Sequence, residues 1–90
     1  MDLQFKRMND REVKELYDVA RKLNKKVVKA KVNKLRVAYC KQGNFTLCAI
    51  KSGRKIFAGV AKCARKFDDF RNITGRALSL SRAARQYMEE

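Results

Sequence analysis

Lysine and arginine are the residues of this chain whose chemistry and spacing stand out. Residues 19–67 contain 15 of the 23 basic residues and no aspartate or glutamate. A surface that serves solubility alone mixes both signs of charge, so a block of one sign on a folded element is better explained by an anionic partner. The chemistry that this block predicts is the neutralisation of phosphates.

Nucleic acid, either DNA or RNA, is the polyanion that the spacing of these cations favours. Basic residues recur at short intervals through residues 25–36, where they could follow successive phosphates along a sheet edge or groove. We expect mostly backbone contacts and little sequence preference, because no ordered set of base-reading side chains is present. The expected phosphate-binding residues are Lys25, Lys26, Lys29, Lys31, Lys34, Arg36, Arg54, Lys55, Lys62, Arg65 and Lys66. If about six to ten of them contact phosphates, the slope of log K against log salt should be roughly −5 to −9.

The aromatic residues leave the mode of nucleic-acid recognition open. Tyr39, Phe45 and Phe57 fall on expected strands, where they could stack on unpaired bases. Phenylalanines such as Phe45, Phe67 and Phe70 more often belong to a hydrophobic core, so stacking is the less favoured mode. The sequence does not choose between DNA and RNA, or between single and double strands.

Catalysis, metal binding and membrane insertion are not expected. The chain has no histidine, the usual general base, and lacks the GxSxG, P-loop and GxGxxG motifs. Cys40, Cys48 and Cys63 are odd in number and have no CxxC spacing, which predicts free, half-buried thiols instead of a disulfide framework or zinc site. No apolar run approaches the ~18 residues of a membrane span, and no signal peptide begins the chain. We therefore expect a non-catalytic, cytoplasmic protein without a cofactor.

A single small domain, residues 1–90, must position the basic block. Hydrophobic residues make up 46% of the chain, which suffices for a modest core despite the net charge of +14. Repulsion among these charges opposes folding, so we expect a bound polyanion or a second subunit to add stability.

The first element is predicted to be an amphipathic helix over residues 10–23. Asn9 can cap its free amides, and Glu12 can complete a capping box. Met8 and Val13 stand where a hydrophobic staple would place them. The apolar residues that follow recur at helical spacing.

Residues 25–40 form the ambiguous segment, which could be strand or helix. Apolar and basic residues alternate from Val28 to Val32, which favours a strand with a turn or bulge at Asn33 and Lys34. A continued helix is the competing interpretation, and the density of β-branched residues favours the strand. The distinction matters because a basic helix could enter a major groove, whereas a strand would follow a phosphate backbone.

The rest of the chain predicts a hairpin and a final helix. Strands over 45–50 and 56–61 flank a turn at Gly53, and a second turn at 41–44 joins them to the preceding strand. Apolar residues then recur from Phe70 to Tyr87 at spacings of three and four. The expected fold is α+β, helix-β-β-β-helix, with both helices packed on one face of a three-stranded antiparallel sheet. The same spacing suits a coiled-coil seam, so the sequence does not decide whether the protein is a monomer or a homodimer.

The element order resembles that of double-stranded RNA-binding domains over most of the chain. The motifs differ from that family, in which a lysine-rich cluster opens the second helix. Here Lys62, Arg65 and Lys66 precede that helix, and Asp68 and Asp69 follow them. The Gly-Pro-x-His loop of the family is also missing.

A second resemblance lies near the C-terminus. Residues 59–63 (GVAKC), Phe67-Asp68 and residues 75–83 (GRALSLSRA) resemble the strand-to-helix ending of small bacteriophage and prophage proteins. This resemblance implies an accessory role against host defence, such as an anti-CRISPR-like inhibitor acting in the host cytoplasm. Such a protein would dock its basic surface on an acidic or nucleic-acid-binding groove of a host protein complex. A shift of naked DNA or RNA by the purified protein would distinguish direct nucleic-acid binding from this alternative.

Overall fold

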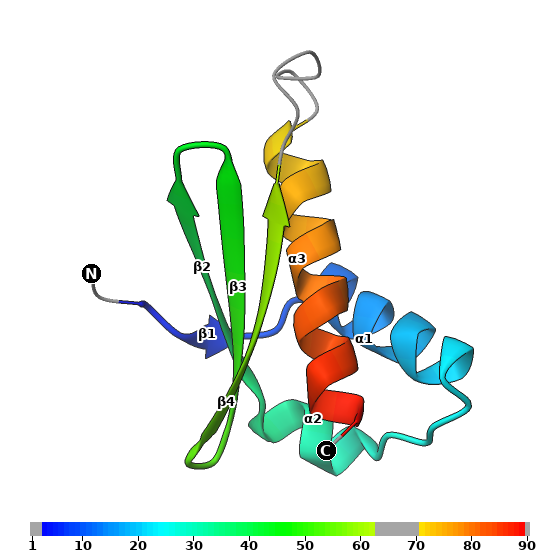
Figure 1. Ribbon diagram of the computed structural model, residues 1–90. Helices are drawn as coiled ribbons and strands as arrows, with labels where there is room; N and C mark the ends of the chain where they lie inside the picture. The colour runs from blue at the N-terminus through cyan, green and yellow to red at the C-terminus, as the bar shows by residue number, and fades with distance from the viewer. Residues whose placement is uncertain (1–2, 63–70, 90) are drawn as a thin grey trace.

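The chain folds as a four-stranded antiparallel sheet with its helices on one face, in agreement with the expected α+β class (Figure 1). The computed structural model describes residues 3–62 and 71–89, the side chains of 71–75 excepted. The elements are β1 (Lys6–Arg7), α1 (Asp10–Lys22), α2 (Lys29–Lys34), β2 (Arg36–Gln42), β3 (Phe45–Ser52), β4 (Lys55–Lys62) and α3 (Arg71–Met88).

The strands pair in chain order from β1 to β4, and β2, β3 and β4 confirm the expected meander. Gly43 and Gly53 stand in its two turns with φ of +57° and +63°, a left-handed conformation that glycine adopts without steric cost. The two-residue strand β1, which the sequence analysis did not include, pairs with the start of β2.

Helix α1 begins and ends as its sequence dictates. The Asn9 side chain accepts a hydrogen bond from the Glu12 amide (2.8 Å), and the Glu12 carboxylate accepts one from the Asn9 amide (2.9 Å), so the capping box is confirmed. At the other end Asn24 has φ of +55°, and the Lys25 amide donates to the Ala20 carbonyl at 2.8 Å. This Schellman-type ending turns the chain away from α1.

The strand expected from Val28 to Val32 is wrong, because this segment contains the helix α2. In a strand Val28 and Val32 would share a buried face, but Val28 is 59% exposed and Val32 only 3%. Val32 and Leu35, three residues apart, are the two that enter the core. Tertiary burial at helical spacing thus overrides β-propensity. The second half of the ambiguous segment is strand β2.

Helix α3 lies directly on β4 because Gly59 has no side chain. A Cβ at residue 59 would stand 2.3 Å from the Ser79 carbonyl oxygen and 2.4 Å from the Ala83 amide nitrogen, both of them backbone atoms. Ser79 and Ala83 are fully buried on the side of α3 that meets the strand. Small residues on both elements therefore allow this close approach.

The hydrophobic core lies between the sheet and the helices. Helix α3 covers β3 and β4, and α1 packs against α3 on the same side of the sheet (Figure 1). The core cluster consists of Leu16, Val19, Ala20, Val32, Leu35, Val37, Cys48, Ile50, Leu80, Ala83, Ala84 and Met88.

We expect Gly59→Ala to lower the free energy of unfolding by about 2 kcal/mol or more, because backbone atoms of α3 cannot yield to the new methyl group. Urea denaturation followed by circular dichroism measures this change. Ala58→Ser is the matched control: Ala58 is the neighbouring residue on the exposed side of β4, and its substitution should change stability by less than about 0.5 kcal/mol. Equal stability of Gly59→Ala and the native protein would contradict the close packing.

Candidate nucleic-acid interface

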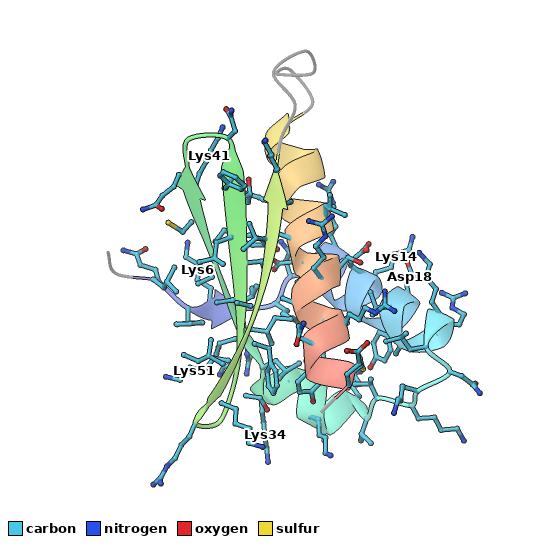
Figure 2. The ribbon with its side chains drawn as sticks, viewed as in Figure 1. Lys6, Lys14, Asp18, Lys34, Lys41 and Lys51 are labelled. Carbon is cyan, nitrogen blue, oxygen red and sulfur yellow. The ribbon has the colours of Figure 1, made fainter. Side chains whose placement is uncertain are left out.

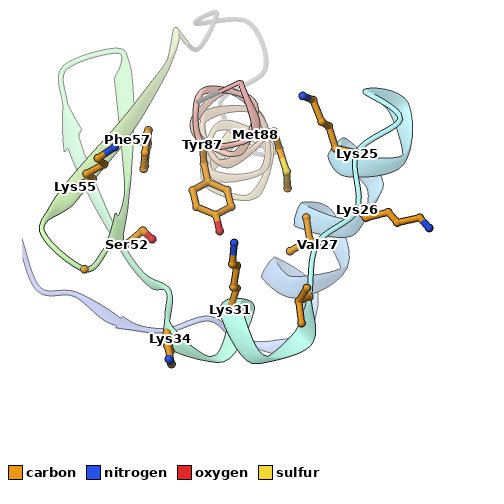
Figure 3. A pocket seen from close by; sticks show the side chains of 12 residues that line it. Lys25, Lys26, Val27, Lys31, Lys34, Ser52, Lys55, Phe57, Tyr87 and Met88 are labelled. Atoms are coloured by element: carbon orange, nitrogen blue, oxygen red, sulfur yellow. The ribbon is translucent and has the colours of Figure 1, made fainter.

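A cleft of about 560 Å³ opens between the end of α3, the segment that leads into α2, and the β3–β4 turn (Figure 3). We call it the basic cleft, because five of its twelve lining residues are lysines. The lining residues are Lys25, Lys26, Val27, Val28, Lys31, Lys34, Ser52, Gly53, Lys55, Phe57, Tyr87 and Met88.

Local structure explains how these side chains come together. The Schellman-type ending at Asn24 turns the chain so that residues 25–28 run along the cleft. Burial of Val32 in the core fixes the rotation of α2, and this leaves Lys31 on the cleft side of the helix. Three segments far apart in sequence thus contribute cations or hydroxyls to one space.

Polar groups converge on the middle of the basic cleft. In Figure 3, Lys31 and Tyr87 point toward each other across the cavity, and the Ser52 hydroxyl points inward from the end of β3. Lys26 and Lys34 point away from the cavity, outside its centre. The centre therefore offers one ammonium and two hydroxyl donors, a set suited to the oxygens of a phosphate.

One wall of the cleft is apolar. The rings of Phe57 and Tyr87 meet edge to face, with centroids 5.4 Å apart and an interplanar angle of 79°. Val27 and Met88 continue this wall. Phe57 is only 9% exposed, so the wall is a rigid extension of the core and not a set of loose surface groups.

The described lining of the cleft contains several cations. Among the residues that the structure describes, none that lines the cleft is acidic. Nearby carboxylates are engaged elsewhere: Asp18 pairs with Arg21, and Glu89 pairs with Arg85 at 3.1 Å. An anion entering the cleft would therefore meet several cations and no lining carboxylate.

Five of the eleven sequence-predicted phosphate-binding residues line the cleft, and the structure separates the others. Arg54 lies in the β3–β4 turn beside it, whereas Lys29 lines a different hollow with Arg7 and Asp10. The five in the cleft are Lys25, Lys26, Lys31, Lys34 and Lys55.

The remaining predicted cations are remote or engaged. The Arg36 guanidinium donates to the carbonyls of Asn33 and Leu35, each at 3.0 Å. The Lys62 ammonium lies 5.9 Å from the centre of the Phe45 ring, at the far end of β4. Arg65 and Lys66, which were also predicted to bind phosphate, lie outside the described residues. Figure 2 shows that basic side chains are spread widely over the molecule. The cleft is a place where several of them lie close together.

Sequence reasoning missed the uncharged half of the cleft. The sequence pattern indicated only that Ser52 belongs to a turn and that Tyr87 is the last residue of an apolar helix face. Position alone offered a signal for Tyr87, because a tyrosine at the end of such a face can bury its ring and leave its hydroxyl at the surface. Of the aromatic candidates, Phe57 is the one in the cleft.

A second polar cluster lies at the edge of the core and links β2 to α1. The Tyr39 hydroxyl donates to the Glu12 carboxylate at 2.6 Å, which ties β2 to the start of α1. Arg76 lies 5.3 Å from the centre of the Tyr39 ring. Burial and the bond to Glu12 raise the pKa of Tyr39 well above its ordinary range. The hydrogen bond and the contact with Arg76 thus engage the side chain of Tyr39, whose ring was considered for stacking on unpaired bases.

Cys48 is a fully buried free thiol, and Cys40 is half-buried. Burial, with a smaller contribution from the Glu12 charge, raises the pKa of Cys48 to about 12. Cys63 lies outside the described residues. Within the described ranges no group of three histidines, cysteines or acidic residues is placed to hold a metal ion. No described helix is long and apolar enough to cross a membrane.

Comparison with known proteins gives no relative: no family model matches the sequence, and neither a curated protein nor a solved structure matches it. The function must therefore be inferred from the cleft and the surface of the molecule.

We expect the stability of the protein to decline at alkaline pH through Cys48. The unfolded thiol ionises near pH 9.0, whereas the folded pKa is about 12, so its contribution is complete below pH 9.0 and is lost as the pH rises toward 12. The loss amounts to about 1.4 kcal/mol per pH unit in this window. Urea midpoints of the native protein and Cys48→Ala, measured from neutral pH to about pH 11, should converge as the pH rises. A constant difference between the two would refute the assignment.

Proposed function

We propose that the protein is a non-catalytic nucleic-acid-binding module whose basic cleft receives the phosphate backbone. The observation that carries this proposal is a cavity lined by five lysines, with the Lys31 ammonium and two hydroxyls directed into its centre and no acidic residue among its described lining. A nucleic-acid backbone presents phosphates in series, so one phosphate can enter the centre while its neighbours meet the lysines around it. Contacts of this kind give affinity without sequence preference.

Five lysines set the expected strength of the salt dependence. Each phosphate contact contributes about −0.7 to the slope of log K against log salt for a single strand, and about −0.9 for a duplex. If all five take part, the slope is roughly −3.5 or −4.5. This slope is shallower than the one of roughly −5 to −9 that the sequence analysis expects for about six to ten contacts.

The decisive test compares two lysines of the same helix. We expect Lys31→Gln to weaken binding and to reduce the salt slope by about 0.7 to 1, since one phosphate contact is lost. Lys29→Gln removes the same charge from α2, but from the hollow shared with Arg7, and should leave the slope unchanged. Fluorescence anisotropy with labelled DNA and RNA at about 50 to 300 mM salt gives both values.

Equal effects of the two variants would mean that overall charge, and not the cleft, binds the polyanion. A flat salt response of the native protein would refute the proposed function. Circular dichroism of both variants controls for folding.

A second candidate function, docking on an acidic protein surface, is favoured by the open face of the sheet. On β4, Ile56 and Val60 are 56% and 44% exposed, and on β3 Phe45 is 48% exposed. In the pairing register, Lys51 lies opposite Ile56 and Lys62 opposite Phe45. An apolar centre with cations at its border fits a partner that presents an apolar stripe flanked by carboxylates. A second copy of this chain would oppose cation to cation.

This second function predicts a different sensitivity to mutation. Val60→Asp should abolish capture of an acidic protein from nuclease-treated host extract, whereas Lys31→Gln should leave that capture intact, because the two residues lie in different sites. Affinity capture followed by mass spectrometry identifies the retained protein. Capture that disappears after nuclease treatment, or that depends on Lys31 and not on Val60, would exclude docking through the sheet.

A further inference from the structure

We infer that the basic cleft seats one unpaired nucleotide, with its phosphate in the polar centre and its base on the apolar wall. This inference rests on the proposed function and adds the form of nucleic acid that is bound. It follows from the division of the cleft into two halves of different chemistry.

The polar half fits a single phosphate group. Lys31 supplies an ammonium from α2, and Ser52 and Tyr87 supply hydroxyls from β3 and α3, all directed into the cavity (Figure 3). A tetrahedral phosphate accepts hydrogen bonds on several sides at once, so donors arriving from three elements suit it better than they suit a planar carboxylate. The lysines at the mouth, such as Lys25, would meet the phosphates on either side.

The apolar half fits a base. Phe57 and Tyr87 form a fixed aromatic pair, and Val27 and Met88 extend the surface beside it. Pure backbone binding needs no such wall, because phosphates gain nothing from apolar contact. A flat base does gain from it, through stacking and burial that do not depend on sequence.

The size of the cleft selects an unpaired nucleotide over a duplex. A volume of about 560 Å³ is ordinary for a small-molecule site and accommodates one nucleotide. A base that remains paired and stacked in a duplex cannot reach this wall, because Tyr87 and Val27 are half-buried and Phe57 and Met88 are buried. Single strands, or duplexes with a displaced base, are therefore the preferred ligands.

The test varies the ligand and leaves the protein folded. It uses fluorescence anisotropy with three probes of about twelve nucleotides: single-stranded oligo-dT, the same backbone with abasic tetrahydrofuran residues in place of every thymidine, and a duplex. We expect the abasic strand to bind about ten-fold more weakly than oligo-dT at the same salt slope, because stacking is lost and every phosphate is kept. The duplex should also bind more weakly than oligo-dT.

Two variants separate the halves of the cleft. Tyr87→Phe keeps the ring and removes the hydroxyl. It should therefore lower the affinity for oligo-dT and the affinity for the abasic strand by the same factor. Tyr87→Leu removes the ring as well, so it should reduce the ratio between the affinities for oligo-dT and for the abasic strand. Both variants are compared at equal fraction folded, determined by urea denaturation.

Each outcome decides the inference. Equal affinity for oligo-dT and the abasic strand, or tighter binding of the duplex, overturns the seated nucleotide while the proposed phosphate binding stands. Failure of all three probes to bind with a salt-dependent affinity overturns the proposed function and this inference together.

Discussion

The contact between the backbone of α3 and β4 at Gly59 is the constraint on which the rest of the molecule depends. It sets the height of α3 above the sheet, and the helix then continues along the core to Tyr87 and Met88 at its end. The end of α3 consequently stands opposite α2 with a space between them. The basic cleft is that space, so a packing detail at the middle of β4 determines the position of a site at the end of the molecule.

A strongly charged chain of this size must also keep its charges apart from one another. The described acidic residues lie on α1 and just after α3, where Glu12 completes a capping box and accepts a hydrogen bond from Tyr39, and Asp18 and Glu89 pair with nearby arginines. The strands and α2 contain no acidic residue to offset their cations. Under the proposed function, repulsion among the lysines of the cleft would favour the binding of an anion, and the bound anion would add stability.

The two faces of the sheet have separate consequences. The helical face is filled by small and apolar residues and carries the stability of the domain. The open face has exposed apolar side chains such as Ile56 and Val60, beside lysines. The cleft at one end and the open sheet face share no residues, so the two proposed functions can be tested independently of each other.

The sequence by itself determined the local structure and the sign of the charge. The capping box at Asn9 and Glu12, the turn at Gly53 and the acid-free block depend on neighbouring residues, and they could be predicted. Only the tertiary structure decided that α2 is a helix, because burial of Val32 and Leu35 outweighs the β-propensity of the segment. It also decided which lysines meet Ser52 and Tyr87, since these residues converge only through the packing of α3 on the sheet. Short-range interactions depend on residues that are close in sequence, so the sequence alone predicts them. The assembly of a cleft depends on how segments distant in sequence pack together.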